Sequence, residues 1–194
     1  LEINPFVFKD NNLYILDLVS RLDDTASYQN HKRWMDAGEF DFPNPFGSNL
    51  SQSEANIDSL DSKSGASLKF KLINPLGRIW LLTSGGGGSV VFADTIGDLG
   101  YHQEIANYSD YSGNPNSDET QEFCENIFAE MFKSPAKNKV LIIAGGIANF
   151  TDIAKTFIGV AKAISTYQEE FRKQNVKIFV RRGGPNYKQG LERM

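Results

Sequence analysis

The sequence predicts an α/β fold, namely a doubly wound and mostly parallel sheet that begins at about residue 67. Short apolar runs typical of buried strands alternate with longer runs whose apolar residues recur every three to four positions. Glycine-rich turns separate the two kinds of run, and the order strand, turn, helix repeats. In such sheets ligands bind outside the carboxyl ends of the strands. We therefore expect the motifs at 85–88, 145–151 and 181–184 to meet at one edge.

The first 66 residues precede this regular pattern. Residues 1–20 predict a β-hairpin, because apolar runs flank the segment 9–12, whose Asp and Asn residues tolerate tight-turn dihedral angles. Residues 21–66 match no regular period. We expect a long connection there, with one short helix near 24–37 and another near 52–61, and we place a domain boundary between 66 and 67.

From residue 67 the elements can be assigned in order. Strands are expected at 67–73, 78–82, 139–143 and 176–180. Helices are expected from the glycine turn to about residue 99, over 118–133 and over 151–172, where apolar residues form stripes at helical spacing. Cys124 lies on the apolar face of the second helix and is expected in the core.

The composition excludes several classes of protein. The 194 residues carry a formal net charge of −4, whereas proteins that bind nucleic-acid backbones usually have a basic face. A single cysteine excludes an internal disulfide framework and a Cys-rich zinc site. No apolar run approaches the roughly 20 residues of a membrane span, and no signal peptide opens the chain. We expect a cytoplasmic setting, neither a nucleic-acid nor a membrane partner, and two ends cut from a longer protein.

The glycine-rich segment 84–89 has two interpretations. It resembles a flexible linker, yet strongly apolar runs bracket it on both sides. The alternative is a strand-to-helix turn at Gly85, Gly86 and Gly87, where backbone N–H groups face an anion at the start of a helix. The pattern does not distinguish a phosphate from a carboxylate.

Two further motifs follow predicted strands. Asn149 and Thr151 stand where the third helix begins, so they either cap that helix or bind a carboxylate with its free N–H groups. Arg181 and Arg182 follow the last strand, and strand alternation points them in opposite directions. Only one of the two should face the ligand edge, where a guanidinium offers a bidentate fork to a carboxylate; the other interpretation is a surface charge.

Asn4 and Asp17 lie on opposite strands of the predicted hairpin. Asp17 is an acid within an apolar run, and a buried carboxylate needs a partner or a metal. Asn and Asp oxygens suit Mg²⁺ shared with nucleotide phosphates. The alternative is an acid at a strand end that faces solvent.

The chain resembles a known enzyme family. The hairpin, with Asn4-Pro5 and then Asp17 on the next strand, resembles the last hairpin of the ATP-grasp domain in acyl-CoA synthetases of the succinyl-CoA synthetase type. Further on, the sequence is similar to the ATP-citrate lyase family over nearly its whole length. The motifs that carry this similarity lie, in order, at 61–69, 74–80, 106–113, 147–151 and 179–187.

The resemblance implies a function and a set of partners. It implies a flavodoxin-like citrate-binding domain at 67–194, truncated at its C-terminus, preceded by the terminal part of an ATP-grasp domain and a linker at 1–66. The complete enzyme would use ATP, Mg²⁺ and coenzyme A to convert citrate to acetyl-CoA and oxaloacetate through phosphohistidine, citryl phosphate and citryl-CoA. The phosphohistidine and the citrate-synthase-like domain would lie in other domains or a second subunit of an oligomer, so the fragment alone would bind citrate and catalyse nothing.

The resemblance also assigns residues. The positions that match the family's citrate contacts are Gly113, Asn149, Thr151, Tyr167 and Arg182. Gly85, Gly86 and Gly87 would lie beside the citrate and phosphoryl site. Asn4 and Asp17 match Mg²⁺ ligands, and a second metal loop is matched more weakly by Asp61, Ser64 and Ala66.

Two departures from the family pattern matter. Gly100-Tyr101 stands where paired glycines are common, and Gly146 stands where the family often has a serine next to citrate. The alternatives are a citryl-CoA synthetase small subunit, which this segment does not separate from the lyase, and a non-catalytic citrate-binding module. A succinyl-CoA synthetase β subunit fits less well, because Asn149, Thr151 and Arg182 match residues that serve the extra carboxylates of citrate.

Overall fold

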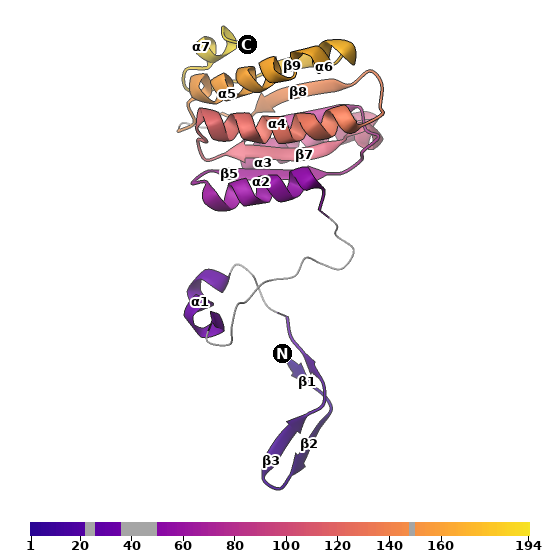
Figure 1. The fold of residues 1–194 in the computed structure, drawn as a ribbon, viewed down its shortest axis with the longest axis vertical. Helices are drawn as coiled ribbons and strands as arrows, with labels where there is room; N and C mark the ends of the chain where they lie inside the picture. The colour runs from indigo at the N-terminus through magenta and orange to yellow at the C-terminus, as the bar shows by residue number, and fades with distance from the viewer. Residues whose placement is uncertain (22–25, 36–49, 148–149) are drawn as a thin grey trace. The chain divides into compact units, whose positions relative to one another are not determined.

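The computed structural model describes residues 1–21, 26–35, 50–147 and 150–194. The chain divides into two compact units, Leu1–Ser48 and Asn49–Met194. Figure 1 shows the elements of each unit. The second unit begins before residue 67, so the predicted boundary is too late. The reason is helix α2 (Gln52–Lys63), whose Ile57 is buried in the core of the second unit.

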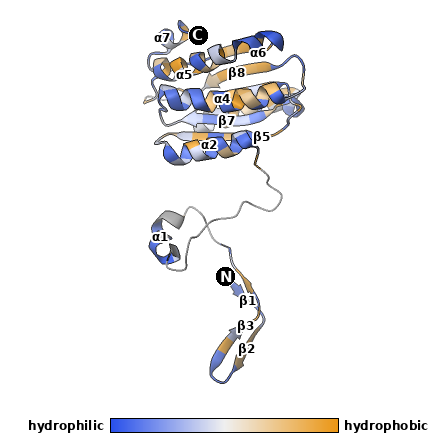
Figure 2. Ribbon diagram, in the orientation of Figure 1, coloured by the Kyte–Doolittle hydropathy of each residue, from blue (hydrophilic) through white to orange (hydrophobic). Residues whose placement is uncertain are grey.

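The first unit contains the predicted hairpin. Its strands are β1 (Glu2–Ile3), β2 (Phe6–Lys9), β3 (Asn12–Ile15) and β4 (Leu18–Val19), and helix α1 (Ser27–Met35) follows. β2 pairs antiparallel with β3, and β1 pairs antiparallel with β4. Asp10 and Asn11 form the turn with positive φ angles, as their residue types predict. The successive residues Phe6, Val7 and Phe8 of β2 are all exposed, so apolar side chains are exposed on both faces of the hairpin. Figure 2 shows where hydrophobic residues occur along the ribbon.

The second unit is built on parallel strands. Its strands are β5 (Ser67–Leu72), β6 (Ile79–Ser84), β7 (Asn107–Ser112), β8 (Val140–Gly145) and β9 (Lys177–Arg181). β6, β8 and β9 form a parallel sheet in that order, and β5 pairs antiparallel with β7. Four of these strands are predicted by the sequence. β7, with its polar sequence NYSDYS, is not.

Side chains join the two sheets into one layer. The backbone N–H and C=O of Leu81 on β6 bond to the Asn107 side chain on β7, each at 2.9 Å. Two residues further on, the N–H of Thr83 donates to Ser109 Oγ at 3.1 Å. A parallel bridge between Ile79 and Ile105 begins this seam. The order across the layer is therefore β5-β7-β6-β8-β9, with all strands except β5 parallel.

Helices lie on both faces of this layer (Figure 1). α2, α4 (Ser117–Lys133) and α5 (Ile153–Thr166) lie on one face, and α3 (Gly86–Ile96) lies on the other. A π-helical turn (Gly97–Tyr101) and a 3₁₀ turn (His102–Glu104) follow α3. The predicted helix over 151–172 is two helices, because the backbone leaves helical geometry at Tyr167 before α6 (Gln168–Lys173) begins. The last helix is α7 (Tyr187–Leu191).

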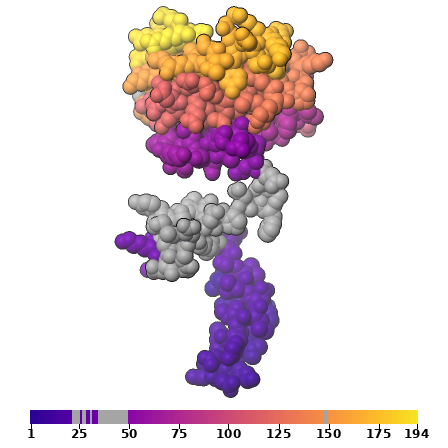
Figure 3. All heavy atoms as spheres, in the orientation of Figure 1, coloured from indigo at the N-terminus to yellow at the C-terminus, as the bar shows by residue number. Residues whose placement is uncertain are grey.

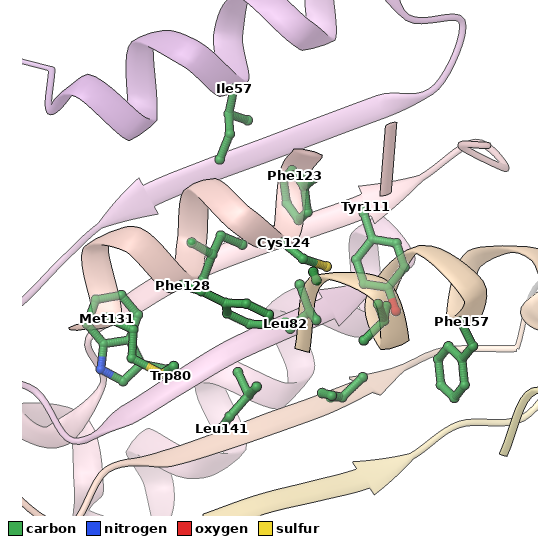
Figure 4. Packing of buried hydrophobic residues seen from close by; sticks show 14 of the residues in the cluster. Ile57, Trp80, Leu82, Tyr111, Phe123, Cys124, Phe128, Met131, Leu141 and Phe157 are labelled. Carbon is green, nitrogen blue, oxygen red and sulfur yellow. The ribbon is translucent and has the colours of Figure 1, made fainter. Parts of the chain in front are cut away.

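The core lies between the layer and helices α4 and α5 (Figure 4). Trp80, Phe128 and Leu141 have no exposed surface, and neither does Cys124, as predicted. Figure 3 shows the close packing of the elements of this unit. Among the described residues, no helix is both long enough and apolar enough to span a membrane.

Candidate functional site

The carboxyl ends of β6, β8 and β9 meet at one edge of the layer, as predicted from the glycine motifs. The N–H of Gly146, after β8, donates to the carbonyl oxygen of Ser84 at the end of β6, at 3.0 Å. The N–H of Ile153 donates to the carbonyl oxygen of Pro185, beyond β9, at 3.1 Å. The segments that follow the three strands are therefore in direct contact.

Arg182 is the cation buried at this edge. Its side chain is 6% exposed, whereas Arg181 is exposed, so the expected opposite orientation of the two arginines is confirmed. Nη2 donates to Ser84 Oγ at 2.9 Å, and Nη1 donates to the carbonyl oxygen of Gly146. Nε is also buried and has no hydrogen-bond partner among the described residues. A guanidinium held on one side with donors to spare can receive a carboxylate.

Gly145 makes room for this arginine. A Cβ atom at position 145 would lie 2.5 Å from Arg182 Nη1 and 2.6 Å from the carbonyl oxygen of Ser84. Any side chain there would displace the guanidinium or the end of β6. The glycine at position 145 is therefore a packing requirement of Arg182.

The segment 84–89 is a strand-to-helix turn, and the linker interpretation is wrong. Gly85 has a φ of 92° and precedes the first residue of α3, Gly86. No side chain caps this helix. The first-turn N–H groups of a helix lack intrahelical partners, so a start made of glycines offers them to an anion without steric hindrance. A Cβ at Gly88 would lie 3.0 Å from Gly146 N, which places this turn directly beside the end of β8.

The start of α5 lies at the same edge. Thr151 is buried, and Asn149 lies outside the described residues. The N-cap is Asp152, whose Oδ1 accepts from the N–H of Lys155 at 3.2 Å, so the expectation that Asn149 or Thr151 caps this helix is wrong.

Asp152 also connects the segments after three strands. Its N–H donates to Asn114 Oδ1 at 3.1 Å, and its Oδ2 accepts from Asn186 Nδ2 at 3.2 Å. Gly113 lies beside this connection with a φ of 78°, and a Cβ there would lie 3.0 Å from the Cα of Ala66. The structure thus gathers Gly113, Thr151 and the segment after β9 at the edge where Arg182 lies. The role of Asp152 was missed, because both amide partners are distant in sequence.

A buried carboxylate at this edge was also missed. Asp110 on β7 is 4% exposed, and it accepts hydrogen bonds from Ser89 Oγ at 3.0 Å and from Ser112 Oγ at 2.9 Å. Ser89 lies in α3, so Asp110 ties this helix to β7. Strand alternation predicts half-burial at best for a polar strand such as β7, and gives no signal for this residue.

Tyr167 is not brought to this edge. It follows the last residue of α5, about 20 Å along the helix from its start at about 1.5 Å per residue. Its ring stacks on Phe132 with a centroid distance of 5.6 Å and packs edge-on against Phe128 at 6.0 Å. These contacts lie at the C-terminal end of α4, and they give Tyr167 a packing role.

The second loop expected to hold a metal is occupied by protein contacts. Asp61 Oδ1 accepts from the N–H of Leu68 at 2.7 Å, and Oδ2 pairs with Lys69 Nζ at 2.5 Å. Ser64 Oγ donates to Glu119 and accepts from the N–H of Ala66. The described part of the chain contains no group of three or more His, Cys, Asp or Glu residues that could hold a metal ion.

Asn4 and Asp17 lie opposite each other where the hairpin passes from one strand pair to the other. Asn4 lies between β1 and β2, and Asp17 lies between β3 and β4. Both are exposed, and Asp17 Oδ1 accepts from the N–H of Leu18 at 2.9 Å. Asp17 is therefore not a buried acid in this unit.

A cavity of about 600 Å³ adjoins the edge on the face that carries α3. The two glycine turns and Arg181 line one end of the cavity, and apolar side chains line the rest, including Val91, Phe92 and Ile142. The site at Arg182 is thus polar, and the neighbouring cavity is largely apolar.

Comparison with known proteins identifies the family. The model of the family described as ATP citrate lyase citrate-binding matches residues 48–194. The chain belongs to this family. ATP-citrate synthase alpha chain protein 2 of Arabidopsis thaliana is 47% identical over the whole chain, which covers 45% of that protein. ATP-citrate synthase of Homo sapiens is 49% identical over the whole chain, which covers 17% of it.

Solved structures of ATP citrate lyases share the fold. The enzyme of Methanothrix soehngenii in complex with citrate and coenzyme A has a TM-score of 0.87 and 50% identity, covering 99% of this chain and 46% of that one. A variant of the Methanosaeta concilii ATP citrate lyase in complex with (3S)-citryl-CoA also has a TM-score of 0.87, with 49% identity, covering 99% of this chain and 47% of that one. The chain therefore spans less than half the length of these ATP citrate lyases.

Proposed function

We propose that this chain is the citrate-binding part of an ATP-citrate lyase, and that Arg182 holds a citrate carboxylate at the edge described above. The observation that carries the proposal is the burial of one arginine, held by Ser84 and Gly146, between two helix starts of a chain in the citrate-binding family. Citrate in complex with the homologous enzyme supports the choice of ligand.

The charge of this edge suits citrate, which is a trianion near neutral pH. The guanidinium of Arg182 supplies one full positive charge. The starts of α3 and α5 add the positive ends of two helix dipoles, each of which favours an anion by about 0.3–1 kcal/mol. This local field, which the buried Asp110 carboxylate at the same edge partly offsets, supports the binding of an acidic ligand by a chain with a net charge of −4.

The proposed contacts are Arg182, Thr151, Asn149 and Gly113, with the turn at Gly85, Gly86 and Gly87 beside the ligand. Thr151 contributes a buried hydroxyl next to the helix start. Asn149 lies outside the described residues, so its place among the proposed contacts rests on the sequence motif alone. We leave Tyr167 out of this site, because its ring packs at the opposite end of α5.

The proposal extends to the longer enzyme. There, ATP, Mg²⁺ and coenzyme A would convert citrate to acetyl-CoA and oxaloacetate through a phosphohistidine on another domain or subunit of a cytoplasmic oligomer. The coverage of less than half of each relative supports missing catalytic parts. The strand order β5-β7-β6-β8-β9 supports a flavodoxin-like domain, and the exposed apolar hairpin supports a remnant of an ATP-grasp domain.

Of the two expected metal sites, only one fits. Asn4 and Asp17 flank the paired residues Ile3 and Leu18 and are exposed, so their side-chain oxygens would hold Mg²⁺, which neutralises nucleotide phosphates when bound. The oxygens of Asp61 and Ser64 are already engaged by the protein, so we propose no metal at that loop.

Arg182→Ala tests the proposal. Citrate should raise the melting temperature of the unaltered chain, because a ligand that binds only the folded state stabilises it. Arg182→Ala should lower the affinity for citrate by at least tenfold. The matched control is Arg172→Ala, which removes the same charge from an exposed position at the end of α6.

If citrate raised the melting temperature of Arg182→Ala and of Arg172→Ala by the same amount, the role of Arg182 would be contradicted. A folded chain that citrate does not stabilise, even at millimolar concentration, would contradict citrate binding by this part of the enzyme. Turnover that depends on ATP and coenzyme A in the longer polypeptide would then separate a lyase from a binding module.

A further inference from the structure

Ser84, the last residue of β6, lies directly against the guanidinium of Arg182. Its side chain is 1% exposed. Ser84 Oγ accepts a hydrogen bond from Arg182 Nη2 at 2.9 Å, and it donates to the carbonyl oxygen of Tyr111 at 2.7 Å. Neither the family match nor the sequence motifs assign a role to this hydroxyl.

The two hydrogen bonds fix the direction of the hydroxyl. A serine hydroxyl has a single proton, and here that proton is donated in the hydrogen bond to the carbonyl oxygen of Tyr111 on β7. The oxygen lone pairs are then left for Arg182. The hydroxyl therefore acts as an acceptor toward the guanidinium, and the backbone of β7 determines where that acceptor points.

The guanidinium is held from two strands at once. Ser84 on β6 accepts from Nη2, and the carbonyl of Gly146 beyond β8 accepts from Nη1. Nε remains buried without a partner among the described residues. The side chain of Arg182 thus reaches from the end of β9 across β8 to β6, and its plane is set by acceptors on both terminal nitrogens.

We propose that Ser84 is a positioning residue for Arg182, which sets the orientation in which the guanidinium meets the carboxylate of its ligand. This inference rests on the proposed function, since it takes citrate as the ligand of Arg182. A guanidinium recognises a carboxylate through parallel N–H bonds in one plane, so a rotated guanidinium loses affinity even though its charge remains.

Tyr111, whose backbone carbonyl accepts the hydrogen bond from Ser84, also has its side chain near Arg182. The hydroxyl of Tyr111 is buried and has no hydrogen-bond partner among the described residues. Burial raises its pKa above the ordinary value, while the charge of Arg182 opposes that rise. The Tyr111 phenol therefore stays neutral beside the arginine and adds no negative charge to the site.

The neighbouring residue supplies a matched control. Thr83 has no exposed surface, and its hydroxyl donates to the carbonyl oxygen of Ser109 on β7, so it joins the same two strands as Ser84 does. The hydrogen bonds of Thr83 to Ser109 do not involve Arg182. Thr83→Val and Ser84→Ala therefore remove the same kind of interstrand bond, but only Ser84→Ala removes an acceptor of the arginine.

The first test compares citrate affinity in these two variants. Ser84→Ala should weaken citrate binding about tenfold, while Thr83→Val should leave the dissociation constant within about twofold after both melting temperatures confirm a folded chain. Arg182→Met completes a double-mutant cycle, in which Ser84→Ala should have no further effect once the guanidinium is gone. An unchanged affinity in Ser84→Ala, or an equal loss with and without Arg182, would overturn the proposal.

The second test does not need citrate. In ¹⁵N-resolved NMR spectra of the chain, the Nε–H proton of Arg182 should exchange slowly with water in the unaltered protein and in Thr83→Val, and at least tenfold faster in Ser84→Ala. Equal exchange rates in all three proteins would overturn the positioning role. If citrate fails to bind the folded unaltered chain, the proposed function is wrong, and the exchange rates still decide whether Ser84 holds Arg182.

Discussion

At the scale of single residues, burial of Arg182 is the feature on which the site depends. Strand alternation predicts that one of the two adjacent arginines turns inward, and the structure shows that it is the second. The sequence could not show its acceptors, because Ser84 is 98 residues away along the chain. The roles of Asp110 and Asp152 were missed for the same reason: their partners are gathered by the fold.

Gly145→Ala should lower the affinity for citrate, and it should reduce the free energy of unfolding less than the truncation of a core side chain does. The added Cβ would meet Arg182 Nη1 at 2.5 Å, so the guanidinium must move. We expect a loss of about 1–3 kcal/mol in the free energy of unfolding, typical of overpacking, and a citrate affinity at least tenfold lower.

Gly65→Ala is the control for this prediction. A Cβ at Gly65 would meet nothing within 4 Å, and the position is exposed. Urea unfolding and citrate titration of both variants provide the measurement. Wild-type affinity in a folded Gly145→Ala variant would show that the position of the guanidinium does not matter.

At the scale of elements, periodicity predicts the apolar strands and most of the helices but not β7. The sequence NYSDYS of β7 contains too few apolar residues to indicate a buried strand. Its polar side chains are buried because Asn107 and Ser109 replace a backbone ladder with β6. A polar strand that bonds through its side chains cannot be distinguished from a loop by sequence pattern.

Asn107→Ala should therefore be strongly destabilising. It leaves the N–H of Leu81 without a partner in the interior, at a cost of about 1–3 kcal/mol, whereas the C=O of Leu81 keeps its bond from Ser109 Oγ at 2.7 Å. Asn56→Ala removes an exposed amide pair with Asn126 and should change the free energy of unfolding by less than about 0.5 kcal/mol. Denaturant unfolding of the two variants measures the difference, and equal values would mean that the seam between β6 and β7 contributes little.

The pH dependence of stability should show the contribution of Glu54. Burial raises its pKa, but hydrogen bonds from Ser51, Lys71 and the N–H of Leu72 outweigh burial, so the pKa lies below its ordinary value of 4.5. A pKa that is lower in the folded state stabilises the protein above the unfolded value, and this stability is lost as the pH falls through the folded value. Glu54→Gln should reduce the fall in stability between pH 7 and pH 3.

Glu104 provides the comparison for Glu54. Its pKa is also lowered, chiefly by its hydrogen bonds to Arg78, but the pair lies at the surface. Glu104→Gln should change the acid dependence of the free energy of unfolding much less, because exposed ion pairs contribute little. A larger effect from Glu104 than from Glu54 would contradict the importance of the hydrogen bonds that Glu54 accepts.

At the scale of the whole molecule, the sequence predicts the fold class. It does not predict how much of each face of the sheet is covered by helices. Leu81, Ile142 and Phe179 lie in one row across β6, β8 and β9. Leu81 is fully buried, Ile142 is half-buried, and Phe179 is 58% exposed, so the face that carries α3 is left uncovered toward β9. α3 is rich in apolar residues, yet Ser89 is its one buried residue.

This face should be covered in longer polypeptides of the family, because exposed apolar patches commonly mark surfaces that contact another protein part. Phe179→Ser should change the melting temperature of the 194-residue chain by less than about 2 °C, and it should lower that of the longer polypeptide by at least twice as much. Leu76→Ser, at an exposed turn position, is the control. If Phe179→Ser changed the melting temperature equally in the 194-residue chain and in the longer polypeptide, the sheet face that carries α3 would be uncovered in both.

The central claim is that this edge of the sheet binds citrate in preference to smaller carboxylates. A calorimetric titration of the chain with citrate, and in parallel with succinate, tests it most directly. The arrangement of Arg182 between the starts of α3 and α5 predicts saturable citrate binding at least tenfold tighter than succinate binding, because succinate lacks the third carboxylate. Equal affinity for the two acids, or no heat of binding from a folded chain, would contradict the claim.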